Sequence, residues 1–251
     1  RGEGMTAVVL TRPQADSERL SQALQDEGFQ TRVMPIMTIE AMPAAELALA
    51  PSFCDDTLCI FISANAVRFG LPQLGPELAA YPELTVIAVG NKTRDTLEAE
   101  GIHAEVPARA DSEGLLEMPA LSAPDSRDVV IVKGEGGREL LASELTRRGA
   151  RVTEWACYRR CWPDVDVSGL AELGAGLVFQ ASSGEMLSRL TALLAGEGQA
   201  DLFQSPIIVP SGRVASLATE AGWGQVILAE DASDDAFIRA LKQHTQPGTN
   251  R

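Results

Sequence analysis

Four short turns rich in serine, asparagine and glycine carry the residues of this chain best suited to bind an anion. Each follows an apolar run that predicts a strand and precedes a stretch that predicts a helix, so free backbone N–H groups and short hydroxyls are expected there. The alternative is plain helix capping, which is the better interpretation of any single turn. Four similar turns together favour a binding site for a carboxylated or phosphorylated ligand. They are Ser63-Ala64-Asn65, Gly90-Asn91-Lys92-Thr93, Ser182-Ser183-Gly184 and Ser211-Gly212-Arg213.

Two cations follow apolar runs at equivalent places in the two halves of the chain. Arg12 ends the first run, and Lys133 ends the run 121 residues later. Both suit an anionic ligand, and the alternative is a surface charge beside a helix. After Lys133, the segment Gly134-Glu135-Gly136-Gly137 offers backbone amides to an anion. It matches neither G-x-G-x-x-G nor the P-loop pattern, so nucleotide binding is disfavoured.

Tyr158 stands beside two arginines, Arg159 and Arg160, where the first half gives way to the second. This cluster is suited to line a cleft between domains, and the alternative is that the aromatic ring packs at the junction while the arginines are solvated. The only histidines, His103 and His244, are far apart, which leaves little for a catalytic triad or a multi-histidine metal site. We therefore expect any chemistry of this chain to use neither histidine.

Composition excludes several classes of protein. Of the 251 residues, 45% are hydrophobic and 22% are charged, which is typical of a folded globular chain. The net charge of −14 opposes non-specific binding to nucleic acid or anionic lipid. No apolar run is long enough to span a membrane, and 1–4 are interpreted as a cloning scar before Met5. The four cysteines lack C-x-x-C spacing, so we expect free thiols in the cytoplasm.

The elements that must position these residues are predicted by short, almost continuously apolar runs. Such runs are typical of a parallel sheet covered on both faces. Helices are predicted at 14–27, 91–100, 137–148 and 211–221, and each is followed by a glycine suited to a left-handed C-cap. The sequence therefore predicts an α/β fold. The predicted strands are 7–10, 58–62, 86–89, 129–132, 177–179, 207–209 and 226–228.

An internal repeat organises these elements into two similar domains. One unchanged shift of 121 positions aligns strand, helix and C-cap residues, which coincidence among Ala- and Leu-rich helices explains poorly. Two such domains facing one another would form a cleft, the usual place for a ligand. The shift places Val8, Val9, Leu20, Leu24 and Gly28 on Val129, Val130, Leu141, Leu145 and Gly149.

The order of the motifs resembles the uroporphyrinogen-III synthase family from Met5 to about Leu241. Two positions depart from the family pattern: Ile62 stands where threonine is common, and Gln180-Ala181 precede Ser182 where a hydroxyl residue is common. The motifs are Leu10-Thr11-Arg12-Pro13, Phe61 to Val67, Ala88 to Thr93, Ser112 to Leu116, Gly134 to Arg138, Tyr158-Arg159-Arg160 and Pro210 to Arg213.

The resemblance implies a discontinuous first domain, 5–38 plus 162–251, and a second domain, 39–161. Two β-prone connectors around 33–39 and 154–160 would form a two-stranded link between them. The turns and cations above, with Gly134 and one further arginine, supply the predicted substrate-binding residues. They are Arg12, Ser63, Ala64, Asn65, Gly90, Asn91, Thr93, Lys133, Gly134, Arg138, Ser182, Ser183, Ser211 and Arg213.

The implied reaction closes the linear tetrapyrrole hydroxymethylbilane, a small-molecule polycarboxylate, with inversion of ring D and loss of water. The resemblance implies that Tyr158 is catalytic, that no cofactor takes part and that contact with hydroxymethylbilane synthase is transient. The rival hypothesis is a non-enzymatic two-domain binding or sensor module for a small polycarboxylate, because fold does not fix function.

Overall fold

The fold was analysed in a computed structural model that describes residues 6–137, 139–173 and 176–245. These residues divide into two compact units. Unit 1 comprises the described residues up to Thr38 and those from Cys161 onward, and unit 2 comprises Ile39–Arg160. Arg138, one of the predicted site residues, lies outside the described residues. None of the helices in the described part is long and apolar enough to cross a membrane.

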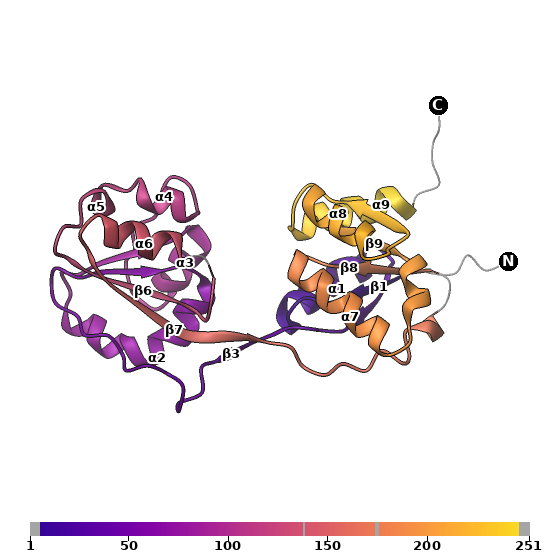
Figure 1. The fold of residues 1–251 in the computed structure, drawn as a ribbon, viewed down its shortest axis with the longest axis horizontal. Coiled ribbons are helices and arrows are strands. Elements are labelled where there is room, and N and C mark those ends of the chain that lie inside the picture. Colours follow the sequence, from indigo (N-terminus) through magenta and orange to yellow (C-terminus); the bar gives the residue numbers. More distant parts are fainter. Residues whose placement is uncertain (1–5, 138, 174–175, 246–251) are drawn as a thin grey trace. The chain divides into compact units, whose positions relative to one another are not determined.

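Unit 1 is built on one five-stranded sheet with the order β10-β9-β8-β1-β2, and every neighbouring pair is parallel. The first strand of the chain, β1, therefore lies beside β8, a strand made from its last third (Figure 1). In chain order the elements are β1 (Ala7–Leu10), α1 (Gln14–Asp26), β2 (Gln30–Val33), β8 (Leu177–Gln180), α7 (Gly184–Gly196), β9 (Pro206–Val209), α8 (Gly212–Glu220), β10 (Gln225–Leu228) and α9 (Asp234–Thr245), with 3-10 turns at Ala171–Leu173 and Ala200–Gln204.

Unit 2 carries a second five-stranded sheet, with the order β3-β7-β6-β4-β5. The pairs β7-β6, β6-β4 and β4-β5 are parallel, and β3 neighbours β7 where the chain passes from one unit to the other. The elements are β3 (Thr38–Ala41), β4 (Leu58–Phe61), α2 (Ala64–Ala80), β5 (Thr85–Ala88), α3 (Asn91–Ala99), α4 (Ser112–Leu116), α5 (Pro119–Ser122), β6 (Asp128–Gly134), α6 (Leu140–Arg147) and β7 (Arg151–Cys161).

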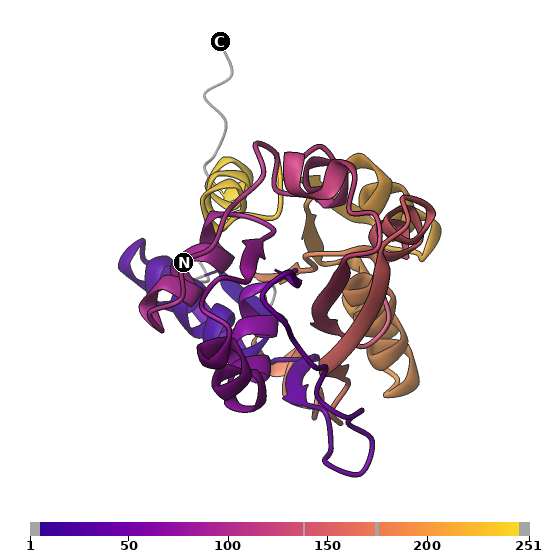
Figure 2. The same cartoon turned by 90° about the vertical axis from the view of Figure 1, so that its left-hand side faces the viewer.

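Alternating strand residues bury both faces of each sheet. In unit 1, Val9 and Phe179 pack under α7 and α8, while Val8 and Val178 pack under α1 and α9. Unit 2 repeats this scheme with α2 and α3 on one face and α4, α5 and α6 on the other. Helices therefore cover both faces of each sheet (Figures 1 and 2), and the predicted α/β class with parallel sheets is confirmed.

The helix ends explain where the prediction was right and where it was wrong. Gly28, Gly101, Gly149 and Gly222 all have φ between 77° and 97°, as expected for left-handed C-caps. The helix predicted from 137 instead begins at Leu140. Gly136 and Gly137 have φ of 72° and 92°, and a right-handed helix cannot include that conformation.

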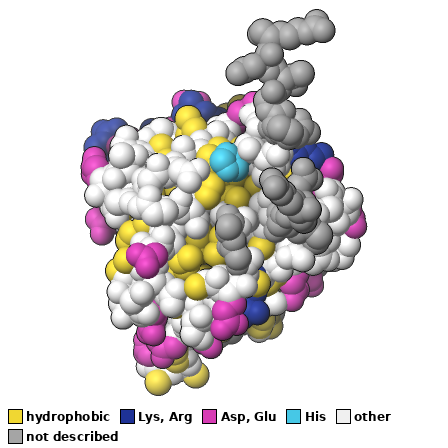
Figure 3. Space-filling model, turned by 90° about the vertical axis from the view of Figure 1, so that its right-hand side faces the viewer, with side chains coloured by type: hydrophobic (Ala, Val, Ile, Leu, Met, Phe, Trp, Pro, Cys, Tyr) yellow, Lys and Arg dark blue, Asp and Glu magenta, His cyan; other side chains and the backbone are white. Residues whose placement is uncertain are grey.

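One face of unit 1 shows how the charges are distributed over the surface. Hydrophobic side chains are visible in the middle of this face, with acidic and basic side chains interspersed around them (Figure 3). The described residues therefore form no extended basic patch on this face, whereas nucleic-acid-binding domains usually carry one.

Candidate functional site

The carboxyl edge of the unit 2 sheet brings together residues from four consecutive strands. Tyr158 lies near the end of β7, Gly134 ends β6, Ser63 follows β4 and Gly90 follows β5. Because the carboxyl ends of parallel strands meet at one edge of a sheet, these four residues form one row. Segments up to 95 residues apart in sequence thus reach the same edge.

Tyr158 is held on three sides. Its hydroxyl lies 2.9 Å from the Oγ of Ser63, and its ring lies 5.8 Å, centroid to centroid, from that of Phe69. A β-bulge between Lys133 and Gly134 sets Gly134 opposite Tyr158. A Cβ at Gly134 would come within 2.6 Å of the Cε2 of Tyr158, so only glycine leaves room for this ring position.

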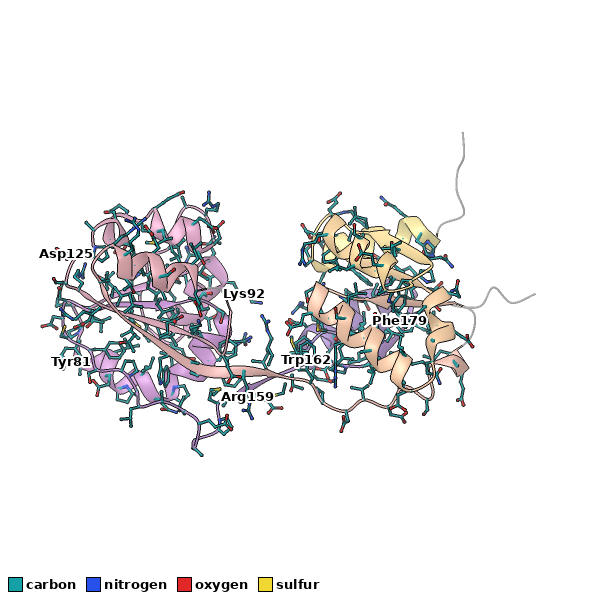
Figure 4. All side chains as sticks on the ribbon, in the orientation of Figure 1. Tyr81, Lys92, Asp125, Arg159, Trp162 and Phe179 are labelled. Atoms are coloured by element: carbon teal, nitrogen blue, oxygen red, sulfur yellow. The ribbon has the colours of Figure 1, made fainter. Side chains whose placement is uncertain are left out.

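The predicted turns of unit 2 begin helices. Ser63 caps α2, because its Oγ accepts a hydrogen bond from the Ala66 amide at 2.9 Å. Gly90 caps α3 without a side chain, and Asn91 is exposed in the first turn beside Lys92. Figure 4 shows the Lys92 side chain extending from α3. Backbone amides at both helix starts therefore point to the carboxyl edge.

Several predicted side chains of unit 2 face the interior instead. Thr93 is only 3% exposed, and Ala64 is buried with it beneath the edge. Asn65 is partly exposed, and its Oδ1 lies 3.4 Å from Arg68 Nη1. The hydroxyl of Thr93 is thus not presented to solvent, so any contact of that residue with a ligand would have to involve its backbone.

Lys133 does not join Tyr158. Its Nζ donates a 2.6 Å hydrogen bond to Glu154 on β7, and the residue is 9% exposed. Strand residues alternate between faces, which puts Lys133 on the face opposite Val132, while Tyr158 packs against the cluster that contains Val132. The cation expected to suit an anionic ligand is therefore part of an ion pair on the other face of the sheet.

The arginines beside Tyr158 have partners as well. Arg159, labelled in Figure 4, projects from β7, and its Nη1 lies 3.0 Å from Glu46 Oε2. Trp155, three residues before Tyr158, is fully buried and donates to the Ala48 carbonyl at 3.1 Å. The half-buried Tyr158 packs its ring against Phe69 and the core of unit 2, so the packing alternative stays open for this residue beside the catalytic one.

The carboxyl edge of the unit 1 sheet also carries serines that cap helices. Ser183 caps α7 through the Met186 amide at 3.2 Å, and Ser211 caps α8 through the Val214 amide at 3.4 Å. Ser182 is partly exposed in the turn before Ser183. The exposed Arg213 reaches back over the start of α7, where its Nη1 would lie 3.6 Å from a Cβ at Gly184. Its guanidinium is the predicted cation best placed for a ligand in unit 1.

Arg12 is buried at this edge and already paired. It donates to the Oδ1 of Asp234 at 2.5 Å and to the Ala232 carbonyl at 2.6 Å. With its amide oxygen turned to the guanidinium, Gln180 accepts from Arg12 Nε at 2.8 Å. This contact gives the Gln180 amide a structural role beside Arg12. A shallow pocket at this edge is lined by Arg12, Gln180 and Ser182, among others.

A larger groove in unit 2, of about 710 Å³, lies elsewhere. It is lined by the second half of α2, the start of β5 and the segment after α3, including Tyr81, Thr85 and His103. Thr85 begins β5, so the groove is at the amino end of the strand whose carboxyl end carries Gly90. None of the predicted site residues lines it. Among the described residues, no cluster of three or more metal-ligating side chains is present.

Sequence reasoning missed two features of the Tyr158 site. Phe69 comes from the second turn of α2, and no local spacing connects it to Tyr158. The Ser63 contact was also not predicted, although both residues were singled out separately. Strand order is the signal that could have predicted the contact between Ser63 and Tyr158. With β6 between β4 and β7, the carboxyl ends of β4 and β7 lie two strands apart at the same edge of the sheet.

Comparison with known proteins gives consistent matches along the chain. The family model described as "Uroporphyrinogen-III synthase HemD" matches residues 18–239. The uroporphyrinogen-III synthase of Salmonella typhimurium is 32% identical over 246 residues, covering 94% of this chain and 100% of the relative. The Escherichia coli protein of the same name is 32% identical over 247 residues, with the same coverage.

Solved structures share the fold at lower identity. A uroporphyrinogen-III synthetase from Helicobacter pylori superposes with a TM-score of 0.60 at 16% identity, covering 96% of this chain and 100% of that one. A mutant uroporphyrinogen III synthase from Thermus thermophilus gives a TM-score of 0.53 at 18% identity, covering 95% and 99%. At such identity these matches support the two-unit α/β fold alone.

Proposed function

The chain belongs to the uroporphyrinogen-III synthase family, and from this premise we propose that it converts hydroxymethylbilane to uroporphyrinogen III in tetrapyrrole (heme) biosynthesis. The observation that carries the proposal is the 32% identity to two synthases along their whole length. The reaction inverts ring D and releases water, so we class the enzyme as a cyclising hydro-lyase. The rival binding or sensor module is disfavoured by the same observation.

We propose that the carboxyl edges of the two units bind the polycarboxylate. Backbone amides at the starts of α2, α3, α7 and α8, with Arg213, supply donors for carboxylate groups. Ser63, Asn65, Gly90, Asn91, Ser182 and Ser211 contribute through these turns, whereas Arg12 and Lys133 shape the edges through their ion pairs. Holding the flexible bilane in one arrangement is what selects the isomer, because unguided closure gives isomer I.

We propose Tyr158 as the catalytic proton donor. When the hydroxymethyl C–O bond of ring A breaks, the departing oxygen takes the phenol proton and leaves as water. The electron-deficient carbon is then attacked by the ring D carbon that carries the bridge to ring C. That bridge bond breaks, and the bridge carbon bonds to the free α-carbon of ring D, which inverts the ring. The proton that this α-carbon then loses returns to the tyrosine oxygen, so the cycle closes without an oxidant or a cofactor. A hydrogen-bond donor in the partly desolvated edge also stabilises the charge that develops.

The domains, compartment and partner of this enzyme follow as proposals. We propose a discontinuous domain, 5–38 plus 162–251, and a second domain, 39–161. The division of the described residues into two units supports this, although Cys161 falls in unit 1. All four cysteines are free thiols, which is typical of a reducing cytoplasm. Because the bilane closes spontaneously, transient contact with hydroxymethylbilane synthase would shorten its time in solution.

The test is isomer analysis. The protein is incubated with hydroxymethylbilane freshly made by its synthase, and the products are oxidised to porphyrins and separated by chromatography. We expect isomer III to dominate and to increase with protein concentration. Isomer I alone, formed at the rate seen without this protein, would overturn the proposed activity and favour the binding module.

A further inference from the structure

We propose that Ser63 is a positioning residue for Tyr158: its hydroxyl donates a hydrogen bond to the tyrosine oxygen and leaves the phenol proton free for the substrate. The inference rests on the proposed function, in which Tyr158 delivers a proton to the substrate. The observation behind it is the 2.9 Å contact between the two hydroxyl oxygens.

The capping hydrogen bond at Ser63 favours this direction. A serine hydroxyl has one proton to donate and two lone pairs to accept with. One lone pair of Ser63 accepts the Ala66 amide at 2.9 Å, at the start of the seventeen-residue helix α2. Donation into Oγ by an amide at the positive end of a helix polarises the hydroxyl and makes it a better donor. The tyrosine oxygen is the acceptor within reach.

The direction matters for chemistry. If Tyr158 donated to Ser63, its proton would be engaged inside the protein, and the substrate would meet an oxygen with only lone pairs. When Ser63 donates, the phenol proton is free to turn to the departing hydroxyl of the bilane. The bond from Ser63 also strengthens as negative charge forms on the tyrosine oxygen during proton transfer.

The ring cannot move away from this hydroxyl easily. Gly134 lies beneath it, Phe69 packs against it at an interplanar angle of 30°, and the Tyr158 carbonyl accepts from the Glu135 amide at 2.8 Å. With backbone and ring both fixed, the phenol oxygen stays within reach of Ser63. The contact is therefore a built arrangement and not one rotamer among several.

The other capping serines offer no such contact. Ser183, Ser211 and Ser233 cap α7, α8 and α9 in unit 1, where the chain has no tyrosine. Both tyrosines, Tyr81 and Tyr158, belong to unit 2. Capping alone thus explains Ser183 and Ser211, whereas Ser63 has a second partner.

A double-mutant cycle tests the proposal. We expect Ser63→Ala to lower kcat about tenfold, the worth of one hydrogen bond, with KM nearly unchanged. Ser63→Thr keeps a hydroxyl and should recover most of the rate. In a Tyr158→Phe background, Ser63→Ala should lower kcat less than about twofold, because there is no longer a phenol to orient. Thermal melting of each variant separates loss of the cap from loss of function.

Each contrary outcome has a distinct meaning. An equal loss from Ser63→Ala in both backgrounds, or a rise in KM alone, would overturn positioning in favour of direct substrate contact or capping. If Tyr158→Phe has the parent rate, the catalytic role of Tyr158 fails and the positioning role fails with it, while the synthase activity stands. If the parent protein forms no isomer III, the proposed function itself is wrong.

A spectroscopic measurement tests the contact without relying on activity. Tyrosine labelled with ¹³C at Cζ gives two signals in this chain, which the Tyr81→Phe variant assigns. We expect Ser63→Ala to move the Tyr158 signal and to leave that of Tyr81 in place. An unmoved Tyr158 signal would overturn the hydrogen bond on which the proposal stands.

Discussion

Arg12 and Asp234 are 222 residues apart in sequence, yet the Nη1 of one lies 2.5 Å from the Oδ1 of the other. Asp234 opens the last helix, α9, and also accepts from Arg19 Nε at 2.8 Å. One carboxylate thus joins the first helix of unit 1 to its last. Arg12 is 8% exposed, so this pair is largely shielded from solvent.

Asp234→Asn should destabilise unit 1. The variant leaves the buried guanidinium of Arg12 without its counter-charge, and breaking such a pair costs about 3 kcal/mol. We expect urea unfolding to report a loss of that order. Asp235→Asn is the matched control, because Asp235 is exposed in the same helix turn and should cost less than about 1 kcal/mol. Equal losses in the two variants would contradict a special role for the ion pair.

The same carboxylate predicts a pH dependence. Burial alone would raise the pKa of Asp234. The hydrogen bond from Arg19 and the charges of Arg12 and Arg19 together lower it by more than burial raises it, so the pKa lies below its usual value. The stabilisation is therefore complete above an unfolded-state pKa of about 4 and is lost as pH falls through the lower, folded-state pKa. The difference in unfolding free energy between parent and Asp234→Asn should be constant near neutrality and shrink in acid. A difference that grows on acidification would disprove this sign.

Gly134→Ala should impair catalysis more than stability. Its new methyl group would lie 2.6 Å from Cε2 and 2.7 Å from Cζ of Tyr158, so the ring must shift and the phenol moves with it. We expect kcat to fall by roughly ten- to a hundredfold, within the range of a misplaced general acid. Gly75→Ala is the control, because nothing lies within 4 Å of its Cβ position in α2. Parent activity in Gly134→Ala would show that the Tyr158 ring position is unimportant.

The four thiols should differ in reactivity. Burial raises the pKa of Cys157 to about 12 and also raises that of Cys59, so neither forms thiolate near neutral pH. Cys54 is exposed and Cys161 is partly exposed. Ellman's reagent should label Cys54 first and Cys161 next, and it should reach Cys59 and Cys157 only after unfolding. Mass spectrometry of peptides identifies the labelled sites, and early labelling of Cys157 would contradict its burial.

Ser211→Ala should be mild. The variant removes the cap of α8 and costs about 1 kcal/mol of stability, yet the backbone amides that face a ligand remain. We expect kcat/KM to fall less than about tenfold, in line with amide-based binding. A hundredfold loss in a folded variant would instead assign the Ser211 side chain a direct role in the reaction.

The buried strands could be predicted because their signal is local. Val129 to Val132 is continuously apolar, as a strand covered on both faces must be, and the strand is there. The edge strand β2, Gln30–Val33, gives no such signal, because two of its four residues are exposed and its apolar content is low. The helix at 140–147 begins late because a positive φ at a glycine is a property of the backbone that composition does not specify.

The site was less predictable than the fold because its contacts cross between strands. Lys133 looked free in sequence, but Glu154 lies on the neighbouring strand, at a distance set by the β6-β7 register. In the same way, Thr93 fitted a binding turn, while the first turn of α3 directs its side chain inward. Residue types indicated which groups stand at an edge, and only the pairing of strands determined their partners.

The position of β1 inside its sheet, between two neighbouring strands, limits how early unit 1 can fold. This strand lies between β2 and β8, and β8 leaves the ribosome long after β1 does. At ordinary translation rates the delay is on the order of 10 to 30 s. During that time β1 and β2 lack the other three strands of their sheet. In contrast, 39–160 form an uninterrupted segment that can fold as it emerges. Unit 2 can therefore fold before unit 1, whose sheet cannot be completed until β8 has been synthesised.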